Sequence, residues 1–213
     1  MNVDNQHEYW DKVADQKTFS HPLNLDLLRK YADENSVIVD FGCGYGRLVK
    51  ELLAAGFNNT KGYDTSLQLV ERGRLAGLAL NHIADPSALP FENSTVDCIL
   101  LFAVLTCIPS NKGQMDLIEL LRSKLKPGGI LYISDYYLQQ NEVSKSRYTN
   151  YNGEPQNDGV FQLPEGVVFR HHNRGWISTL LKTFDIQEEN LIEVRTMNGN
   201  PAEAFQVIAA KPY

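Results

Sequence analysis

A tight glycine-rich turn after a short β-branched segment restricts the fold of this chain more than any other feature. Residues 37–41, Val-Ile-Val-Asp-Phe, predict a buried strand. The turn that follows has a glycine at every second position: Gly42, Gly44 and Gly46. Residues 46–55 predict a helix with an apolar face of Leu48, Val49, Leu52 and Leu53. A strand, a tight turn and a helix in this order are typical of a parallel sheet with crossover helices.

The same alternation of strands and helices continues through the first two thirds of the chain. We expect further strands at 60–64, 78–83, 96–102 and 130–134, and helices at 66–76 and 111–125. After them we expect a β-hairpin at 160–170, a helix capped by Asn173, and two late β-rich segments at 186–196 and 202–210. We therefore predict an α/β fold, a doubly wound Rossmann-like sheet with helices on both faces.

Length and composition predict one domain that spans residues 1–213. With 43% hydrophobic residues, the chain can bury a full core without disulfides or metal ions. Residues 1–30 predict a helical cap, in which Tyr9 and Trp10 either cover a ligand or simply pack on the sheet. Residues 136–172 predict a lid on the substrate side, because the periodicity disappears after residue 136; a disordered loop is the alternative.

The charge and the cysteines narrow the class of protein. A net charge of −6, from 20 basic and 26 acidic residues, argues against nucleic acid as a partner. The odd set Cys43, Cys98 and Cys107 argues against a disulfide framework and favours a reducing cytoplasmic location. The apolar stretch 98–105 is too short to span a membrane, so we expect a soluble protein without a membrane partner. We expect this protein to be a monomer or a homodimer.

The turns at the carboxyl edge of the sheet predict a nucleoside-type ligand. A nicotinamide fingerprint would need a third glycine at position 47, which is Arg47. Asp64 ends the second strand, where a carboxylate can accept both hydroxyls of a ribose. A plain tight turn is the alternative for the glycines alone, and Asp64 in register with them weakens that alternative.

Five segments in order carry a more specific signal. They are Val-Ile-Val-Asp-Phe-Gly-Cys-Gly-Tyr-Gly-Arg, Gly-Tyr-Asp-Thr-Ser, Ala-Asp-Pro-Ser-Ala-Leu-Pro-Phe, Val-Asp-Cys-Ile-Leu-Leu-Phe and Leu-Lys-Pro-Gly-Gly-Ile-Leu, all within residues 37–135. This set resembles the motifs of class I S-adenosylmethionine-dependent methyltransferases. The resemblance implies S-adenosylmethionine as the cofactor and a seven-stranded sheet in the order 3-2-1-4-5-7-6, with the last strand antiparallel.

The resemblance also implies a role for each motif residue. The methionine end of the cofactor would lie against Asp40 and the backbone of Gly42 and Gly44, the ribose against Asp64, the adenine amino group against Asp85, and the sulfonium side against the Phe102 backbone. Gly46 and Thr65 complete the first two motifs. The residue after the adenine-binding acid often donates its N–H to the ring, but here it is Pro86, which has none, so Ser87 would donate instead. Further contacts to the methionine carboxylate are expected from Lys17, Thr18, His21 and Arg47.

Methyl transfer from a sulfonium is a direct displacement, so positioning can supply most of the acceleration. Where the acceptor must lose a proton, we expect a general base among His171, His172 and Tyr136, which lie near the lid. The alternative for the two histidines is a surface or helix-capping role. We expect no metal site, because neither His-x-x-x-His nor clustered cysteines occur.

The expected function is thus methyl transfer to a small acceptor with apolar or partly aromatic character, which suits the tyrosines and Phe161 of the lid. The sequence leaves the identity of the acceptor and its methylated atom open. Two other classes remain: a nicotinamide-dependent oxidoreductase, which would share the fold and Asp64, and a non-catalytic protein that binds an adenosyl ligand.

Overall fold

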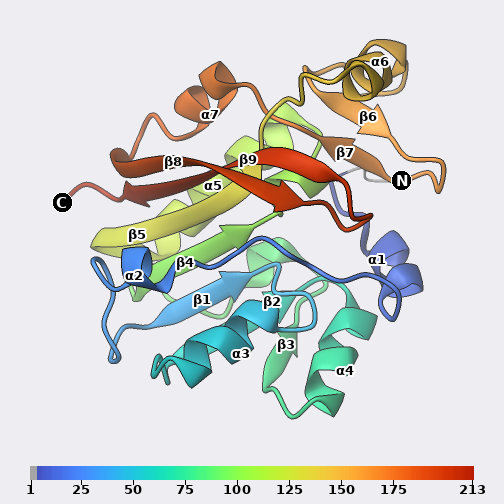
Figure 1. The fold of residues 1–213 in the computed structure, drawn as a ribbon. Coiled ribbons are helices and arrows are strands. Elements are labelled where there is room, and N and C mark those ends of the chain that lie inside the picture. Colours follow the sequence, from blue (N-terminus) through green and yellow to red (C-terminus); the bar gives the residue numbers. More distant parts are fainter. Residues whose placement is uncertain (1–3) are drawn as a thin grey trace.

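A seven-stranded sheet forms the centre of the computed structural model, which describes residues 4–213 (Figure 1). Its strands are β1 (Ile38–Phe41), β2 (Thr60–Asp64), β3 (Leu80–His82), β4 (Val96–Phe102), β5 (Leu125–Tyr136), β8 (Asp185–Arg195) and β9 (Pro201–Ala210). Their spatial order is β3-β2-β1-β4-β5-β9-β8. Strands β1 to β5 pair in parallel, and β9 is antiparallel to both β5 and β8. The predicted order 3-2-1-4-5-7-6 is confirmed, since β8 and β9 are the sixth and seventh strands of this sheet.

Helices cover both faces of the sheet, as expected of a doubly wound fold. They are α1 (His7–Val13), α2 (Leu25–Leu28), α3 (Arg47–Ala54), α4 (Leu67–Leu75), α5 (Asn111–Lys124), α6 (Glu142–Asn150) and α7 (Arg174–Leu180), with 3-10 turns η1 (Pro86–Ala88) and η2 (Leu105–Cys107). One core cluster joins α5 and α7 to the sheet, and a second joins α2 and α3 to the opposite face. Among residues 4–213, no helix is long and apolar enough to cross a membrane.

Strand β4 shows how the two cores are built. Ile99 and Leu101 belong to the cluster with α5 and α7, while Cys98 and Leu100 belong to the cluster with α2 and α3. Successive side chains of a strand point to opposite faces, so a strand buried on both sides is apolar throughout. The continuous apolar run expected at 96–102 is thereby confirmed as a central strand.

Three local expectations were wrong. Leu53 and Met115 were placed on buried helix faces but are 37% and 47% exposed, because each lies at the edge of the face that contacts the sheet. The turn expected at 126–129 is an irregularity inside β5, which begins at Leu125 and shifts register against β4. Gly128, with a φ of +75°, provides the backbone conformation for this bulge.

The segment after β5 is more ordered than its sequence pattern indicates. It contains α6, which no periodicity predicted, followed by the expected hairpin of β6 (Val160–Gln162) and β7 (Val168–Arg170). Asn173 caps α7 by accepting a hydrogen bond from the Trp176 N–H, as predicted. Of the helical cap expected at 1–30, residues 1–3 lie outside the described part of the chain, and the remainder holds two short helices, α1 and α2, joined by a non-helical segment at 14–24.

Candidate active site

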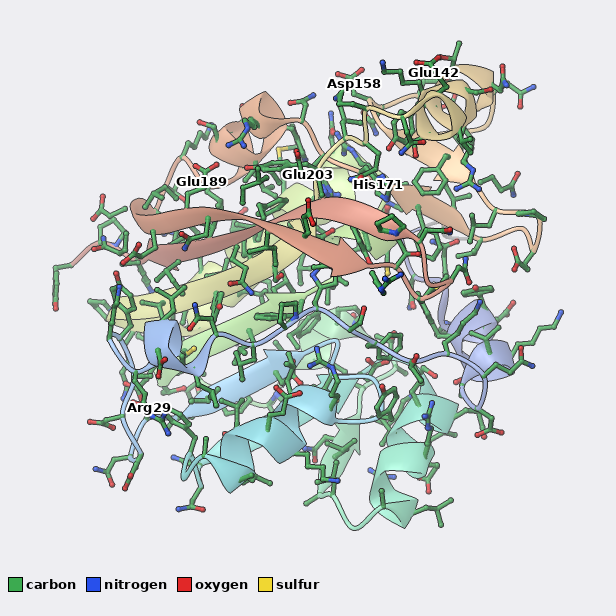
Figure 2. The ribbon with its side chains drawn as sticks, in the orientation of Figure 1. Arg29, Glu142, Asp158, His171, Glu189 and Glu203 are labelled. Carbon is green, nitrogen blue, oxygen red and sulfur yellow. The ribbon has the colours of Figure 1, made fainter. Side chains whose placement is uncertain are left out.

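A cavity of about 560 Å³ opens where the parallel strands end. The loops after β1, β2 and β4 line one side of it, and the end of β5, the β6–β7 hairpin and α6 line the other. This is the edge at which ligands bind in doubly wound sheets. In Figure 2, Glu142 marks α6 at the upper right and His171 lies below it, nearer the sheet. We call the two sides the turn side and the lid side of the cavity.

The glycine turn is shaped for close approach of a ligand. Gly42 has a φ of +71° and Gly44 a φ of +55°, a left-handed conformation that favours glycine. A Cβ atom at Gly42 would lie 2.5 Å from the Val104 side chain, and one at Gly44 would lie 2.5 Å from the Phe19 ring. The missing side chains therefore leave the backbone of both residues at the cavity wall, whereas Gly46 caps α3 and does not line the cavity.

Asp64 is held by the backbone of the neighbouring turns. Its two oxygens accept hydrogen bonds from the N–H groups of Gly44 at 2.7 Å and Ser66 at 2.8 Å. Burial raises the pKa of Asp64, and these N–H groups partly offset that effect. An ionised carboxylate has about four acceptor positions. Asp64 can therefore also accept two hydroxyl groups from a ligand in the cavity, which Thr65 lines beside it.

Three buried polar atoms on the turn side have no hydrogen-bond partner within residues 4–213. They are Asp40 Oδ2, His21 Nε2 and Arg47 Nε. Burial raises the pKa of Asp40 to about 7 and lowers that of His21 to about 4. Buried polar groups are normally paired, so this wall is complementary to a ligand that carries both a cation and hydrogen-bond acceptors. The amino-acid end of S-adenosylmethionine has both.

The adenine motif lies apart from the cavity wall. The Asp85 carboxylate accepts hydrogen bonds from the Ser87 N–H at 2.9 Å and the Ser87 hydroxyl at 2.7 Å. Pro86 begins the 3-10 turn η1. None of these three residues lines the cavity, whereas Phe102 does. The roles implied for Asp85, Pro86 and Ser87 therefore stay predictions.

Tyr136 and His171 meet on the lid side. Their rings lie 5.2 Å apart and both line the cavity. The Tyr148 hydroxyl lies 2.7 Å from His171 Nδ1 and accepts a hydrogen bond from the Gln139 N–H at 3.1 Å. Burial lowers the pKa of His171 to about 3 and raises that of Tyr136, so both side chains are neutral near pH 7.

His172 has a different environment from its neighbour. Its side chain is fully buried, with Nε2 2.9 Å from Gln114 Nε2 and Nδ1 3.1 Å from the Tyr136 carbonyl oxygen. Both ring nitrogens are therefore occupied, and the residue does not line the cavity. These contacts join α5 to the end of β5, which is a structural role.

The N-terminal segment and the tip of the β8–β9 hairpin complete the wall. Contacts from the N-terminal segment were expected, whereas no motif predicted the hairpin tip. Lys17 Nζ donates to Asn198 Oδ1 at 2.7 Å, and the Ser20 hydroxyl donates to the Arg195 carbonyl. Lys17 does not line the cavity, while Thr18, His21 and Arg47 do. Phe19 also lines it, stacked on Tyr45 at 5.2 Å. The polar turn at 196–201 is the only signal that could have suggested a functional loop.

Residues 4–213 contain no cluster of three or more His, Cys, Asp or Glu side chains that could hold a metal ion. All three cysteines in that range are free.

The comparisons with known proteins agree with one another, because each finds similarity to methyltransferases. A family model described as a methyltransferase domain matches residues 17–166. A ribosomal protein L11 methyltransferase from Shewanella pealeana is 30% identical over 138 residues, which are 63% of this chain and 46% of that protein. The chain thus spans about half the length of the curated relatives it matches.

Solved structures share the fold over most of the chain. An S-adenosylmethionine-dependent methyltransferase from Methanosarcina mazei aligns with a TM-score of 0.80 and 24% identity, covering 87% of this chain and 97% of its own. Another from Mesorhizobium loti aligns with a TM-score of 0.65 and 19% identity, covering 87% and 96%. At these identities, the likeness concerns the fold.

Proposed function

The chain belongs to the methyltransferase-domain family, and from this premise we propose that it methylates a small molecule held on the lid side of the cavity. The family and the fold make it an S-adenosylmethionine-dependent methyltransferase. The proposed part is the class of acceptor and the residues that act on it. The observation that carries the proposal is that one continuous cavity connects the glycine turn with the aromatic lid side.

S-adenosylmethionine supplies the methyl group when bound, and the turn side has groups that fit it. We assign the ribose hydroxyls to Asp64 and the ammonium group to Asp40, whose Oδ2 is buried without a partner. Arg47 Nε and His21 Nε2 would face the carboxylate end. These assignments satisfy polar atoms that are otherwise buried alone, which would cost about 1–3 kcal/mol each.

The lid side then positions the acceptor. Tyr136 and His171 lie near each other at the end of β5 and beside the hairpin, so they are our proposed proton-handling residues. His171 is unprotonated near neutral pH and can accept a proton, but its pKa of about 3 makes it a weak base. Orientation and exclusion of water therefore contribute more to the rate than proton transfer does. His172 is left out of this set, because both its ring nitrogens are already bonded.

A protein acceptor is the second candidate, since the curated relatives include ribosomal protein L11 methyltransferases. A protein side chain would have to reach the methyl group through the lid. The lid side is instead enclosed by Phe161, Phe169 and α6, which favours a compact acceptor.

Calorimetry and turnover test the proposal separately. We expect S-adenosylmethionine and S-adenosylhomocysteine to bind without competition from NAD. Radiolabelled methyl transfer should then label small aromatic or apolar acceptors and leave ribosomal protein L11 unlabelled. NAD binding in place of the sulfonium ligands would contradict the cofactor assignment, and labelling of protein alone would contradict the small acceptor.

A further inference from the structure

We infer that the methyl acceptor carries a single carboxylate that pairs with Arg147 of the lid helix α6. The inference rests on the proposed function, because it concerns the acceptor held on the lid side of the same cavity. It starts from the charges that line the cavity, which are Asp40, Arg47, Asp64 and Arg147. The first three belong to the turn side, so Arg147 is the only formally charged group that lines the lid side within residues 4–213.

Arg147 has no counter-ion within the described part of the chain. The neighbouring cation on α6, Lys145, pairs with Glu142 at 3.6 Å, and Arg174 of α7 pairs with Glu189 at 2.7 Å. The Arg147 side chain makes none of the side-chain hydrogen bonds or ion pairs found in residues 4–213, although the whole chain carries a net charge of −6. A cation left unpaired at a cavity wall in an acidic protein is available to a ligand anion.

The rest of the lid side is apolar and aromatic. Phe161, Leu163 and Phe169 belong to one buried cluster, and Trp10 and Met197 pack against it. All five line the cavity. Such walls suit the hydrophobic body of a ligand, and Arg147 lies exposed at their rim.

The single positive charge of Arg147 determines which anionic group the acceptor carries. One guanidinium binds a carboxylate through two parallel hydrogen bonds and balances one negative charge. A phosphate dianion would leave a second charge without a partner, because the other polar groups on the lid side are neutral, such as Ser144, Gln139 and Asn198. A cationic acceptor would face Arg147 without any carboxylate on that side.

The position of Arg147 also links the carboxylate to the proposed proton-handling residues. Arg147 is close enough to His171 that its charge helps to lower the pKa of that histidine. An acceptor that pairs with Arg147 therefore has its body beside His171 and Tyr136. This places the charged group of the acceptor at the lid helix and its reactive atom toward the glycine turn.

Benzoate and benzamide test the inference, because they differ in charge and match in size. With the protein saturated in S-adenosylhomocysteine, we expect the wild type to bind benzoate about three- to fivefold more tightly than benzamide, the range of an exposed ion pair, measured by ligand-observed NMR. Arg147→Gln should abolish this preference, and Arg147→Lys should keep part of it. Lys145→Gln removes a cation from the same helix but not from the cavity wall, and it should keep the full preference.

Binding of S-adenosylhomocysteine separates the two possible failures. If the wild type does not bind that nucleoside, the proposed function fails. If it binds the nucleoside normally but shows no preference for benzoate, or if Arg147→Gln retains the preference, the carboxylate inference is overturned. Unchanged affinity of Arg147→Gln for S-adenosylhomocysteine shows that the variant is folded.

Discussion

The carboxyl group of Asp40 is buried at a cost in desolvation free energy, which a bound cation would offset. Its side chain is 1% exposed, and Oδ2 has no partner among residues 4–213. Isolation of this kind favours the protonated form, which is why burial raises the pKa to about 7. The free protein therefore keeps a buried, unpaired carboxyl group at the place where we assign the cofactor ammonium.

The first prediction follows from this pKa. The folded protein holds the proton on Asp40 up to about pH 7, while the unfolded chain releases it near pH 3.8. The stability that this proton provides is complete below pH 3.8 and is lost as pH rises to about 7. The Asp40→Asn variant has no such loss. Between pH 4 and pH 8, its free energy of unfolding should therefore rise by on the order of 2–4 kcal/mol relative to that of the wild type.

Urea unfolding of the free protein at the two pH values measures this gain. Asp26→Asn, which removes an exposed acid from α2, is the matched control and should show no comparable change. Equal pH dependence of wild type and Asp40→Asn would mean that Asp40 is ionised in the folded protein throughout this range.

Asp64 gives the second prediction. Its carboxylate already accepts two backbone N–H bonds and offers further lone pairs to the ribose, so Asp64→Asn keeps the shape but removes the charge. We expect the affinity for S-adenosylhomocysteine to fall by about 1.5–3 kcal/mol, measured by calorimetry. Asp97→Asn, at the opposite end of the sheet, should leave the affinity unchanged. An unaltered affinity of Asp64→Asn would place the ribose elsewhere.

At the scale of elements, the segment 136–172 contains a buried hairpin and an exposed helix. The β6–β7 hairpin buries Phe161 and Phe169, and Arg170, 2% exposed, donates to the Asn111 side chain at 2.7 Å. Helix α6 buries none of its residues. A helix that buries no residue needs no apolar face, so the sequence of α6 lacks apolar periodicity. For this reason the sequence pattern predicted only an irregular insertion there.

The third prediction concerns the attachment of α6. The Tyr148 hydroxyl contacts both Gln139 and His171, so Tyr148→Phe removes two contacts between the helix and the cavity wall. At about 1 kcal/mol for each of the two hydrogen bonds, exchange of the α6 amide hydrogens should become roughly thirtyfold faster. Tyr151→Phe removes a hydroxyl that bonds only to the Glu154 carbonyl and should have little effect. Slow exchange of α6, equal to that of β4, would show that the whole segment is rigid.

At the scale of the whole molecule, local signals and long-range assembly were predictable to different degrees. The strands and the glycine turn follow from segments that carry their own pattern, and Asp64 stands in register with that turn, whereas the strand order follows from the family resemblance. The placement of His172 away from the cavity could not be predicted, because its partner Gln114 is distant in sequence. The contact between Lys17 and Asn198 has no local signal either. Such pairings depend on tertiary packing, which residue spacing does not encode.

Helix α1 lies next to α4 at the edge of the molecule (Figure 1), and its residues contact both the turn side and the lid side of the cavity. Asp11 accepts hydrogen bonds at the start of α4, from the Ser66 hydroxyl at 2.6 Å and the Gln68 N–H at 3.0 Å. Trp10 lies 6.0 Å from Phe19, which covers Gly44, and 6.0 Å from Phe169 of β7. A ligand against the glycine turn is therefore linked to the lid hairpin through the rings on this helix.

The fourth prediction tests that link at Gln6, which precedes α1. Its side chain accepts from the Val168 N–H at 2.8 Å and donates to the Val168 carbonyl at 2.6 Å, so it ties the helix to β7. We expect S-adenosylhomocysteine to slow amide exchange at Val168 in the wild type, since it orders Phe19 and the helix above it. In Gln6→Leu this slowing should disappear while the affinity for the ligand changes less than about threefold, because the one further hydrogen bond lost is the 3.3 Å bond from the Gln6 amide to the Cys107 carbonyl oxygen. Gln16→Leu alters an exposed glutamine of the same segment and should behave as the wild type. Slowing that persists in Gln6→Leu would mean that the two sides of the cavity communicate through the sheet and not through α1.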